Sequence, residues 1–332
     1  MKKALHFKLL TSWLVILLMV SIVAAKDLEQ PSPGWDLSKI RSPIIFRGDA
    51  VTAYRDPAVL YHDDCFHLFF TVCRFEEGVA YWYLGYSQSD NLLEWKTPRL
   101  LTPKDRNLNF SSPGNIVWFE DEWILCLQTY PTPRNESYGT ADSRIWLMRS
   151  KDLIGWSEPE LLRVKGPNIP LESMGRMIDP YLLPDKDEIG KWWCFYKQNG
   201  VSLSWSYDLL HWTYSGHYDS GENVCVLVEG SEYVLFHSPQ NGIAVKRSTD
   251  LSNWRDSGSL ITLGQSNWRW AQGRLTAGTV IDLRHQKGIG RYLMFFHGSE
   301  REGLKVHPAH GRASLGLAWS DDLIDWEWPR QE

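Results

Sequence analysis

The sequence has few cysteines, no block of like charge and no long helical pattern. Its five cysteines form no Cys-x-x-Cys pair and no Cys/His spacing typical of a metal site, so the motifs of zinc and redox proteins are not found. Acidic and basic residues are interspersed, with a formal net charge of −5, so the chain has no electrostatic footprint for nucleic acid. No segment keeps an apolar period of about 3.6 residues, which argues against a sheet covered by helices.

A long apolar run occurs only at the start of the chain. Lysines among the first eight residues precede an apolar stretch that ends in Val23-Ala24-Ala25, a pattern typical of a secretory signal peptide with a small-residue cleavage site. We therefore predict a signal peptide over residues 1–25, a secreted or periplasmic location, and no membrane span after cleavage. The alternative is an uncleaved membrane anchor, because residues 9–25 are almost long enough to span a bilayer.

The cysteines lie mostly in apolar runs that read as strands: Cys65, Cys73, Cys126, Cys194 and Cys225. This pattern predicts small buried apolar side chains. Export would permit a disulfide, but the odd number of cysteines and the size of residues 26–332 make a disulfide framework unnecessary.

Aromatic residues, in contrast, are abundant, with 18 Trp, 14 Tyr and 12 Phe. Part of the tryptophan content comes from a motif, Ser-x-Asp/Asn-Leu-x-x-Trp, that occurs five times, and each interval fits one supersecondary unit. The motif runs from Ser89 to Trp95, Ser150 to Trp156, Ser206 to Trp212, Ser248 to Trp254 and Ser320 to Trp326. We predict that these five tryptophans are structural, packing between neighbouring units.

Each copy of the motif joins two strand-like runs, and a hairpin of two apolar runs lies upstream of it. Two strands plus two strands, repeated five times, predict an all-β fold, a five-bladed β-propeller of four-stranded antiparallel blades, over residues 26–332 as a single domain. The Asp or Asn of each motif is expected to bond the local backbone of a turn. Longer loops at residues 130–140, 163–176 and 264–274 would rise on one face, where binding usually occurs.

The residue just before the first strand of each blade would face a common funnel. These positions hold Asp56, residues 111–115, Asp179, Glu222 and Arg274. The spacing to the aromatic that opens each second strand predicts that the three acids occupy equivalent places in their blades. Converging carboxylates raise each other's pKa, and paired carboxylates are what glycoside hydrolysis requires. The simpler alternative is that Asp-Pro merely starts a strand, with Pro where no ladder N–H is needed.

On these motifs the sequence resembles the five-bladed glycosidases of glycoside hydrolase family 43 and the related families 117, 32 and 68. "YRDPAVLY" resembles the first-blade Asp-Pro that carries the catalytic base, and "MIDPYLLP" is similar to the blade that carries the pKa-modulating Asp. The resemblance implies Asp56 as general base, Asp179 as the residue that tunes the acid, and Glu222 as general acid. The family's Glu is commonly followed by Gly-Pro, whereas this chain has Glu-Asn-Val, which leaves Glu229, Glu172 and His237 as alternative acids.

Further site residues follow from the same comparison. Arg55, Asn115, Asn241 and Arg274 are expected to donate hydrogen bonds to sugar hydroxyls. Trp268 and Trp270, outside the repeat, are expected either to stack on a sugar ring or to pack in the rim of the funnel. His297 is also counted among the substrate-binding residues. It resembles the fifth-blade strand end at which the family has an axial histidine beside a buried ion, so a structural calcium is compatible with the resemblance. No metal is assigned to the catalytic site, and no cofactor is expected to be required.

The predicted function is an exported glycoside hydrolase that cleaves plant or algal oligo- or polysaccharides. Invertase-like families carry Asn-Asp-Pro-Asn-Gly in the first blade, whereas this chain has Arg-Asp-Pro-Ala, which favours inversion of the anomeric centre. The alternative is a glycan-binding propeller without turnover. Phosphorylases and transferases on similar propellers would need a cluster of basic residues or an invertase-like first blade, and neither is evident in the sequence. Arabinofuranosyl, xylosyl, galactosyl and anhydrogalactosyl substrates all occur among the relatives.

Overall fold

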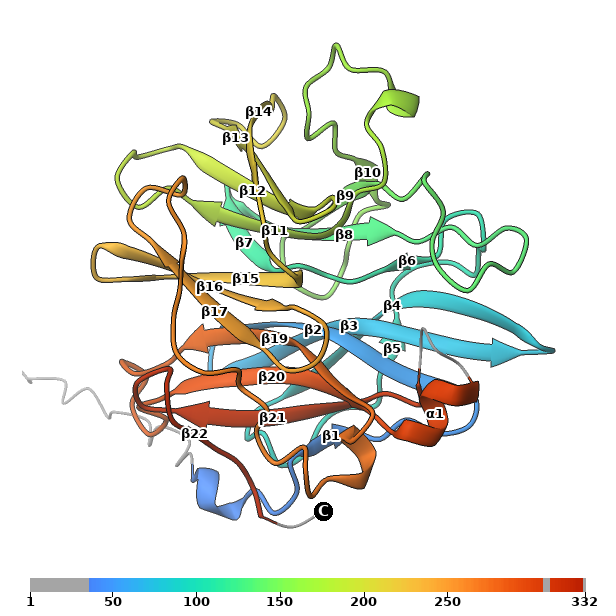
Figure 1. The fold of residues 1–332 in the computed structure, drawn as a ribbon, viewed down its shortest axis with the longest axis vertical. Helices are drawn as coiled ribbons and strands as arrows, with labels where there is room; N and C mark the ends of the chain where they lie inside the picture. Colours follow the sequence, from blue (N-terminus) through green and yellow to red (C-terminus); the bar gives the residue numbers. More distant parts are fainter. Residues whose placement is uncertain (1–35, 307–310, 331–332) are drawn as a thin grey trace, which may run out of the picture. The chain divides into compact units, whose positions relative to one another are not determined.

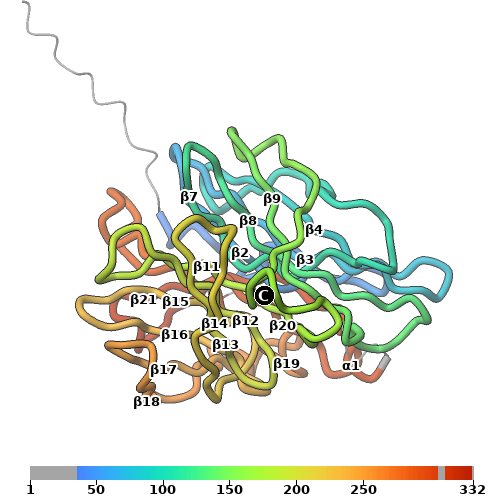
Figure 2. The backbone as a smooth tube through the Cα atoms, turned by 90° about the horizontal axis from the view of Figure 1, so that it is seen from above, coloured from blue at the N-terminus to red at the C-terminus, as the bar shows by residue number. Residues whose placement is uncertain are grey.

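The computed structural model describes residues 36–306 and 311–330, so the predicted signal peptide lies outside the described residues. The described chain forms five antiparallel sheets, and the predicted five-bladed propeller is confirmed (Figures 1 and 2). Helical structure within these residues is limited to three 3₁₀ turns, Leu37–Lys39, Leu171–Ser173 and Arg269–Ala271, and to helix α1, Arg301–Val306. None of these helices is long and apolar enough to cross a membrane.

The blades follow one another along the chain, each running from an inner to an outer strand. Blade 1 contains β2 (Thr52–His62), β3 (Cys65–Glu76), β4 (Val79–Ser89) and β5 (Arg99–Leu100). Blade 2 contains β6 (Phe110–Ser111), β7 (Ile116–Phe119), β8 (Glu122–Thr129), β9 (Ile145–Ser150) and β10 (Glu160–Leu161). Blade 3 contains β11 (Ile178–Pro184), β12 (Trp192–Lys197), β13 (Val201–Ser206) and β14 (Thr213–Tyr218). Blade 4 contains β15 (Glu222–Glu229), β16 (Glu232–Ser238), β17 (Ala244–Ser248) and β18 (Arg255–Asp256).

Blade 5 closes the ring with strands from both ends of the described chain. It contains β19 (Arg274–Asp282), β20 (Tyr292–Ser299), β21 (Ser314–Ser320), β22 (Trp326–Glu327) and the early strand β1 (Ile44–Phe46). Strand β1 pairs antiparallel with β21, and β22 pairs with the same strand further along. The last blade therefore depends on hydrogen bonds to a segment that precedes the first blade, which ties the circle together.

The repeated motif forms the turn between the third and fourth strands of every blade, as predicted. In the copy of blade 2, the Ser150 hydroxyl oxygen accepts the N–H of Leu153 at 2.9 Å, and one Asp152 carboxylate oxygen accepts the N–H groups of Ile154 and Gly155, both at 2.8 Å. The motif leucines all lie in the left-handed region with φ from 56 to 67°: Leu92, Leu153, Leu209, Leu251 and Leu323. Because each such leucine is also buried, its packing offsets the backbone strain.

The hydrophobic core lies between adjacent sheets. Aromatic pairs cross the blade boundaries: Phe69 of blade 1 meets the motif residue Trp156 of blade 2 at a ring separation of 5.3 Å, and Phe236 of blade 4 meets Trp326 of blade 5 at 6.5 Å. The five motif tryptophans all belong to or pack against the buried clusters, in line with the predicted structural role. Four of the five cysteines are buried, Cys65 is half-buried, and all five are free thiols.

Candidate active site

Each blade has one residue in the left-handed region near the propeller axis, within the innermost strand of four blades and directly after β6 in blade 2. These residues are Asp56 (φ 47°), Ser112 (39°), Asp179 (51°), Asn223 (53°) and Ala277 (56°). In four of the blades the pairing register between the first and second strand shifts at this residue, as in a β-bulge. All five line a narrow axial cavity of about 20 Å³, room for about one water molecule.

The predicted equivalence of the three acids is wrong by one residue for Glu222. Glu222 pairs with Ser238 directly before the register shift, just as Arg55 pairs with Thr71, so Asn223 is the true counterpart of Asp56. The spacing does not reveal this shift, because the bulge residue lies 10 residues before Phe66 in blade 1 (Asp56) but 11 before Trp123 in blade 2 (Ser112). In blade 5 the equivalent residue is Ala277 rather than the predicted Arg274.

The backbone N–H of each bulge residue is bonded by a polar side chain. Those of Asp56, Ser112, Asp179 and Ala277 reach across to the second strand of the preceding blade. The acceptors are His297 Nδ1 (3.1 Å), Thr71 Oγ1 (2.8 Å), Gln128 Oε1 (2.6 Å) and Ser238 Oγ (2.8 Å). The N–H of Asn223 instead bonds Asp179 Oδ2 at 3.3 Å. Since a buried unpaired N–H is costly, these side chains fix where the strained residues lie and so position the acids.

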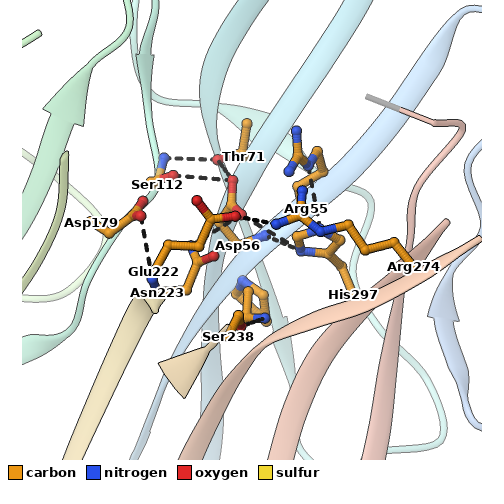
Figure 3. Close-up of polar contacts among 12 residues, drawn as sticks. Arg55, Asp56, Thr71, Ser112, Asp179, Glu222, Asn223, Ser238, Arg274 and His297 are labelled. Carbon is orange, nitrogen blue, oxygen red and sulfur yellow. Dashed lines mark hydrogen bonds and ion pairs between the residues drawn. The ribbon is translucent and has the colours of Figure 1, made fainter. Parts of the chain in front are cut away.

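A second, larger cavity of about 400 Å³ is lined by all three predicted acids. Asp56 comes from β2, Asp179 from β11 and Glu222 from β15, and Figure 3 shows the three carboxyl groups grouped around the same space. Its lining is Arg55, Asp56, Trp82, Ser111, Ser112, Gln128, Tyr130, Tyr138, Arg176, Ile178, Asp179, Lys197, Glu222, Asn223 and Arg274. Each of the three loops predicted to face the binding side contributes to this lining, through Tyr130 and Tyr138, Arg176 and Arg274.

Asp56 is held by neutral hydrogen-bond donors. Its Oδ2 accepts the hydroxyls of Thr71 at 2.9 Å and Ser112 at 3.1 Å, and its Oδ1 accepts the Asn223 amide at 3.4 Å (Figure 3). The residue is 8 % exposed. A carboxylate fixed at both oxygens in this way presents a defined edge to the cavity, which suits a group that must orient a water molecule.

Glu222 is held by cations instead. Lys197 Nζ lies 2.5 Å from Glu222 Oε2, and Arg274 pairs with Oε1. Burial acts to raise the pKa of Glu222, but the charges of Arg274 and Lys197 outweigh it and lower the pKa to about 2. In this arrangement Glu222 is a carboxylate at any ordinary pH.

The pKa of Asp179 is shifted in the opposite direction to that of Glu222. Burial, followed by the nearby carboxyls of Glu222 and Asp56, raises its pKa to about 7. The proton that the acid cluster retains near neutral pH therefore resides on Asp179. Three carboxyls in one cavity thus carry at least two different protonation states, which is the division of labour that acid–base catalysis needs.

His297 lies behind Asp56 rather than in the cavity and is fully buried. Its Nδ1 accepts the Asp56 N–H, and its Nε2 lies 3.4 Å from Arg55 Nε. Burial, Arg55 and Arg274 hold its pKa well below the usual range, so the ring is neutral. The predicted contact of His297 with sugar is therefore wrong, because the ring is covered and positions Asp56 instead.

Both ring nitrogens of His297 are occupied by these contacts, so His297 itself is not placed as a metal ligand. The described residues contain no group of three His, Cys, Asp or Glu side chains placed to hold a metal. No step of the chemistry is assigned to a metal.

Of the other residues predicted to bind substrate, Arg55 and Arg274 line the cavity. Asn115 does not, because its amide donates to Leu182 O at 2.7 Å and accepts Leu182 N–H at 2.9 Å, which joins blade 2 to blade 3. Asn241 lies on a neighbouring hollow that shares Glu222 and Arg274, and its Oδ1 accepts the N–H of Leu275.

Trp268 and Trp270 are packed in the core, and the stacking prediction for them is wrong. They are 4 and 3 % exposed and stack on each other at 5.3 Å and on Phe296. The packed loop on the rim, which the sequence left as the alternative, is the observed arrangement. Their faces are occupied, so neither can receive a sugar ring.

The alternative acids lie elsewhere. Glu229 forms an ion pair with Arg284 and accepts a hydrogen bond from Tyr292, Glu172 is exposed on a 3₁₀ turn, and His237 is buried beside Gly221. None of the three lines the cavity that holds Asp56 and Asp179.

Sequence reasoning missed Trp82, Tyr130, Tyr138, Arg176 and Lys197, all of which line the cavity. They come from strands of two blades and from two loops, and no motif marks them. Lys197 could have been found by its place at the end of β12, which pairs directly with the residue before Asp179. The cluster of basic side chains that the sequence does not reveal is thus assembled only in three dimensions.

No protein-family model matches the sequence, and no curated protein matches it. Solved structures, however, share the fold. An exo-1,5-α-L-arabinanase from a bovine ruminal metagenomic library is 18% identical, covers 85% of this chain and 99% of its own, and gives a TM-score of 0.56. A thermostable family 43 glycoside hydrolase is 12% identical over 88% of this chain and 100% of its own, with a TM-score of 0.59.

The catalytic domain of a family 62 α-L-arabinofuranosidase from Coprinopsis cinerea is 16% identical, covers 84% of this chain and 96% of its own, and gives a TM-score of 0.60. At these identities the likeness establishes the fold. The predicted resemblance in architecture to the five-bladed propellers of family 43 is therefore confirmed, while the chemistry must be argued from the cavity.

Proposed function

We propose that this protein is a glycoside hydrolase. The observation that carries the proposal is the convergence of Asp56, Asp179 and Glu222, from three blades, on one cavity at the propeller axis. A folded protein gains nothing from clustering carboxyls that raise the pKa of Asp179 to about 7, whereas glycoside hydrolysis requires a carboxylate and a proton donor on either side of a glycosidic bond. The glycosidases that share the fold support this assignment.

In the proposed reaction Asp56 acts as general base. The hydroxyls of Thr71 and Ser112 and the Asn223 amide fix its carboxylate, so that it can accept a proton from a water molecule aimed at the anomeric carbon. Mechanistically this is worth about 10² to 10⁴ in rate. Arg55, the preceding residue, also lines the cavity and is placed to donate to sugar hydroxyls.

Glu222 is the proposed general acid and must gain a proton before it can donate one. In the free protein its proton affinity is suppressed by Lys197 and Arg274, while Asp179 holds the proton. We infer that substrate binding draws one of the two cations away from Glu222, so that the proton passes from Asp179 to Glu222 and then to the leaving oxygen. In this scheme Asp179 stores the proton that Glu222 later donates, and in this way it tunes the acid.

Inversion is the proposed stereochemical outcome, on the basis of the Arg-Asp-Pro-Ala sequence of the first blade. The proposed substrates are plant or algal oligo- or polysaccharides, and the proposed site of action is outside the cytoplasm, on the basis of residues 1–25. A panel of such oligosaccharides, with the anomeric product followed by ¹H NMR from the first turnover, tests both points. Release of the retained anomer would refute inversion, and an absence of hydrolysis across the panel would count against the enzyme.

A second candidate is a glycan-binding propeller without turnover. The observation that favours it is the double ion pair of Glu222, which leaves the proposed acid without a proton in the free protein. Binding of a panel glycan without any product after prolonged incubation would support this second candidate.

A further inference from the structure

The cavity contains more positive than negative side chains. Its wall carries Arg55, Arg176, Lys197 and Arg274, against the acids Asp56, Asp179 and Glu222. Lys197 and Arg274 are both committed to Glu222. Within residues 36–306 and 311–330, Arg176 has no Asp or Glu partner at ion-pair distance, so its charge is not balanced locally.

The Arg176 side chain is nevertheless held in place. Its Nε donates to Gly139 O at 3.2 Å, and its guanidinium carbon lies 5.5 Å from the centre of the Tyr130 ring. These contacts use one of the five N–H groups of the guanidinium and leave the two terminal amino groups for another partner. An arginine fixed by its Nε and by an aromatic face is ready to bind an anion with its planar fork.

The backbone around Arg176 is fastened by two further side chains. Gln198 Nε2 donates to Met174 O at 2.7 Å and to Arg176 O at 3.3 Å. Buried Arg144 donates to Gly175 O at 2.9 Å and to Leu171 O at 2.7 Å. Ordering a loop in advance removes an entropic cost from ligand binding. The protein thus uses a buried arginine and a glutamine to hold a segment that places an unbalanced cation on the cavity wall.

We propose that Arg176 forms a subsite for a sugar residue that bears an anionic group, either the carboxylate of a uronic acid or a sulfate ester. This inference rests on the proposed function and narrows its substrate class to acidic glycans. Tyr138, which lines the same cavity and is 59% exposed, offers an aromatic face for the ring of that sugar.

The charge state of the site agrees with this ligand class. Below about pH 7 Asp179 is mainly protonated, so one of the three acids on the cavity wall then carries no charge and the positive excess of the wall grows. A neutral sugar would leave this excess unbalanced inside a partly closed cavity, whereas an anionic sugar compensates it.

The test compares matched pairs of sugars by isothermal titration calorimetry at low ionic strength. Galactose is compared with galacturonate and with galactose 6-sulfate, and glucose with glucuronate. We expect wild type to bind at least one acidic sugar about tenfold more tightly than its neutral partner, with the preferred anion identifying carboxylate or sulfate. This preference should shrink as salt is added.

The variant Arg176→Gln should abolish the preference, because it weakens the binding of acidic sugars more than that of their neutral partners, and Arg176→Lys should retain only part of the preference. Arg134→Gln is the matched control, because Arg134 lies in the loop that contains Gly139, pairs with Glu136 and has a side chain that is 86% exposed outside the cavity lining. Thermal melting checks that each variant is folded.

Equal affinity within both pairs, or the same loss in Arg134→Gln as in Arg176→Gln, would overturn the inference. Hydrolysis of neutral glycans without any acidic preference would refute the inference and leave the hydrolase intact. Binding of acidic sugars without hydrolysis would support the inference and refute the proposed hydrolase. Phosphate-dependent release of a sugar 1-phosphate would overturn both, since the cations would then bind phosphate.

Discussion

Asp56 and Glu222 line the same cavity but are surrounded by different kinds of partner. Asp56 receives hydrogen bonds from two hydroxyls and an amide, whereas Glu222 is bound by a lysine and an arginine. Neutral donors orient a carboxylate without adding a charge, while cations commit it to the ionised form. The base of the proposed reaction is therefore ready in the free protein, and the acid is not.

The largest expected effect comes from removing the base. Asp56→Asn keeps the size of the side chain and an acceptor for Thr71 and Ser112 but cannot take a proton. We expect kcat to fall by about 10² to 10⁴ on any substrate that the panel identifies, with substrate affinity changed less than about threefold. Steady-state kinetics and calorimetry measure the two quantities separately. Activity within tenfold of wild type would remove Asp56 from the role of base.

The next prediction concerns the pH dependence of stability, where Asp179 and Glu222 should differ in sign. The raised pKa of Asp179, about 7 against an ordinary 3.8, means that the folded state holds this proton more tightly than the unfolded state. Its contribution to stability is present below about pH 4 and is lost as the pH rises through about 7. Asp179→Asn should remove this loss, worth a few kcal/mol at about 1.4 kcal/mol per pKa unit.

Glu222 serves as a control, because its contribution to stability should depend on pH with the opposite sign. Its pKa of about 2 lies below the ordinary 4.5, so its contribution is present above about pH 4.5 and is lost as the pH falls toward about 2. Urea unfolding from pH 3 to pH 8 measures both slopes. An Asp179→Asn variant with the wild-type slope between pH 4 and pH 8 would refute the assignment of the retained proton.

The fold could be predicted from the sequence because its signals are local. Each Ser-x-Asp-Leu-x-x-Trp copy contains the hydroxyl, the carboxylate and the leucine that build its own turn, as the contacts of Ser150 and Asp152 show. The Asp-Pro pairs were visible for the same reason, although they lie within β2 and β11 rather than before these strands. The position of the left-handed bulge was not visible in the sequence. Glu222 and Asn223 are neighbouring polar residues, so the apolar pattern of the strand is the same whichever of them occupies the bulge.

The cavity wall could be predicted only in part, because it depends on contacts between blades. Arg176 and Lys197 are ordinary polar residues in the sequence, and they come to line one cavity with Glu222 only in the folded chain. For Trp268 and Trp270 the error was the opposite one, because they were predicted to bind sugar and are instead buried in the core. Stacking on a sugar and packing in a core require the same aromatic side chain, and burial by Phe296 decided between them.

A third prediction concerns the removal of one of the two cations that contact Glu222. Lys197→Met keeps much of the aliphatic stem but removes one of the two charges on Glu222. We expect the pKa of Glu222 to rise by about one unit or more, since only Arg274 then opposes burial. Carbon-13 NMR titration of the glutamate carboxyls measures the shift. An unchanged Glu222 titration would show that Lys197 does not hold this carboxylate in the ionised form.

The smallest expected effect concerns one neutral donor to Asp56. Ser112→Ala removes the hydroxyl 3.1 Å from Asp56 Oδ2 and leaves Thr71 in place. We expect a loss of about 1 kcal/mol in stability and a fall in kcat of about fivefold, because the carboxylate loses part of its orientation. Ser238→Ala is the matched control. Its hydroxyl accepts the backbone N–H of the bulge residue Ala277, which has no acidic side chain, so the substitution should cost similar stability and leave kcat nearly unchanged. Equal kinetic losses in the two variants would mean that the loss does not come from the hydrogen bond to Asp56, and that the neutral donors around Asp56 have no separate part in orienting the base.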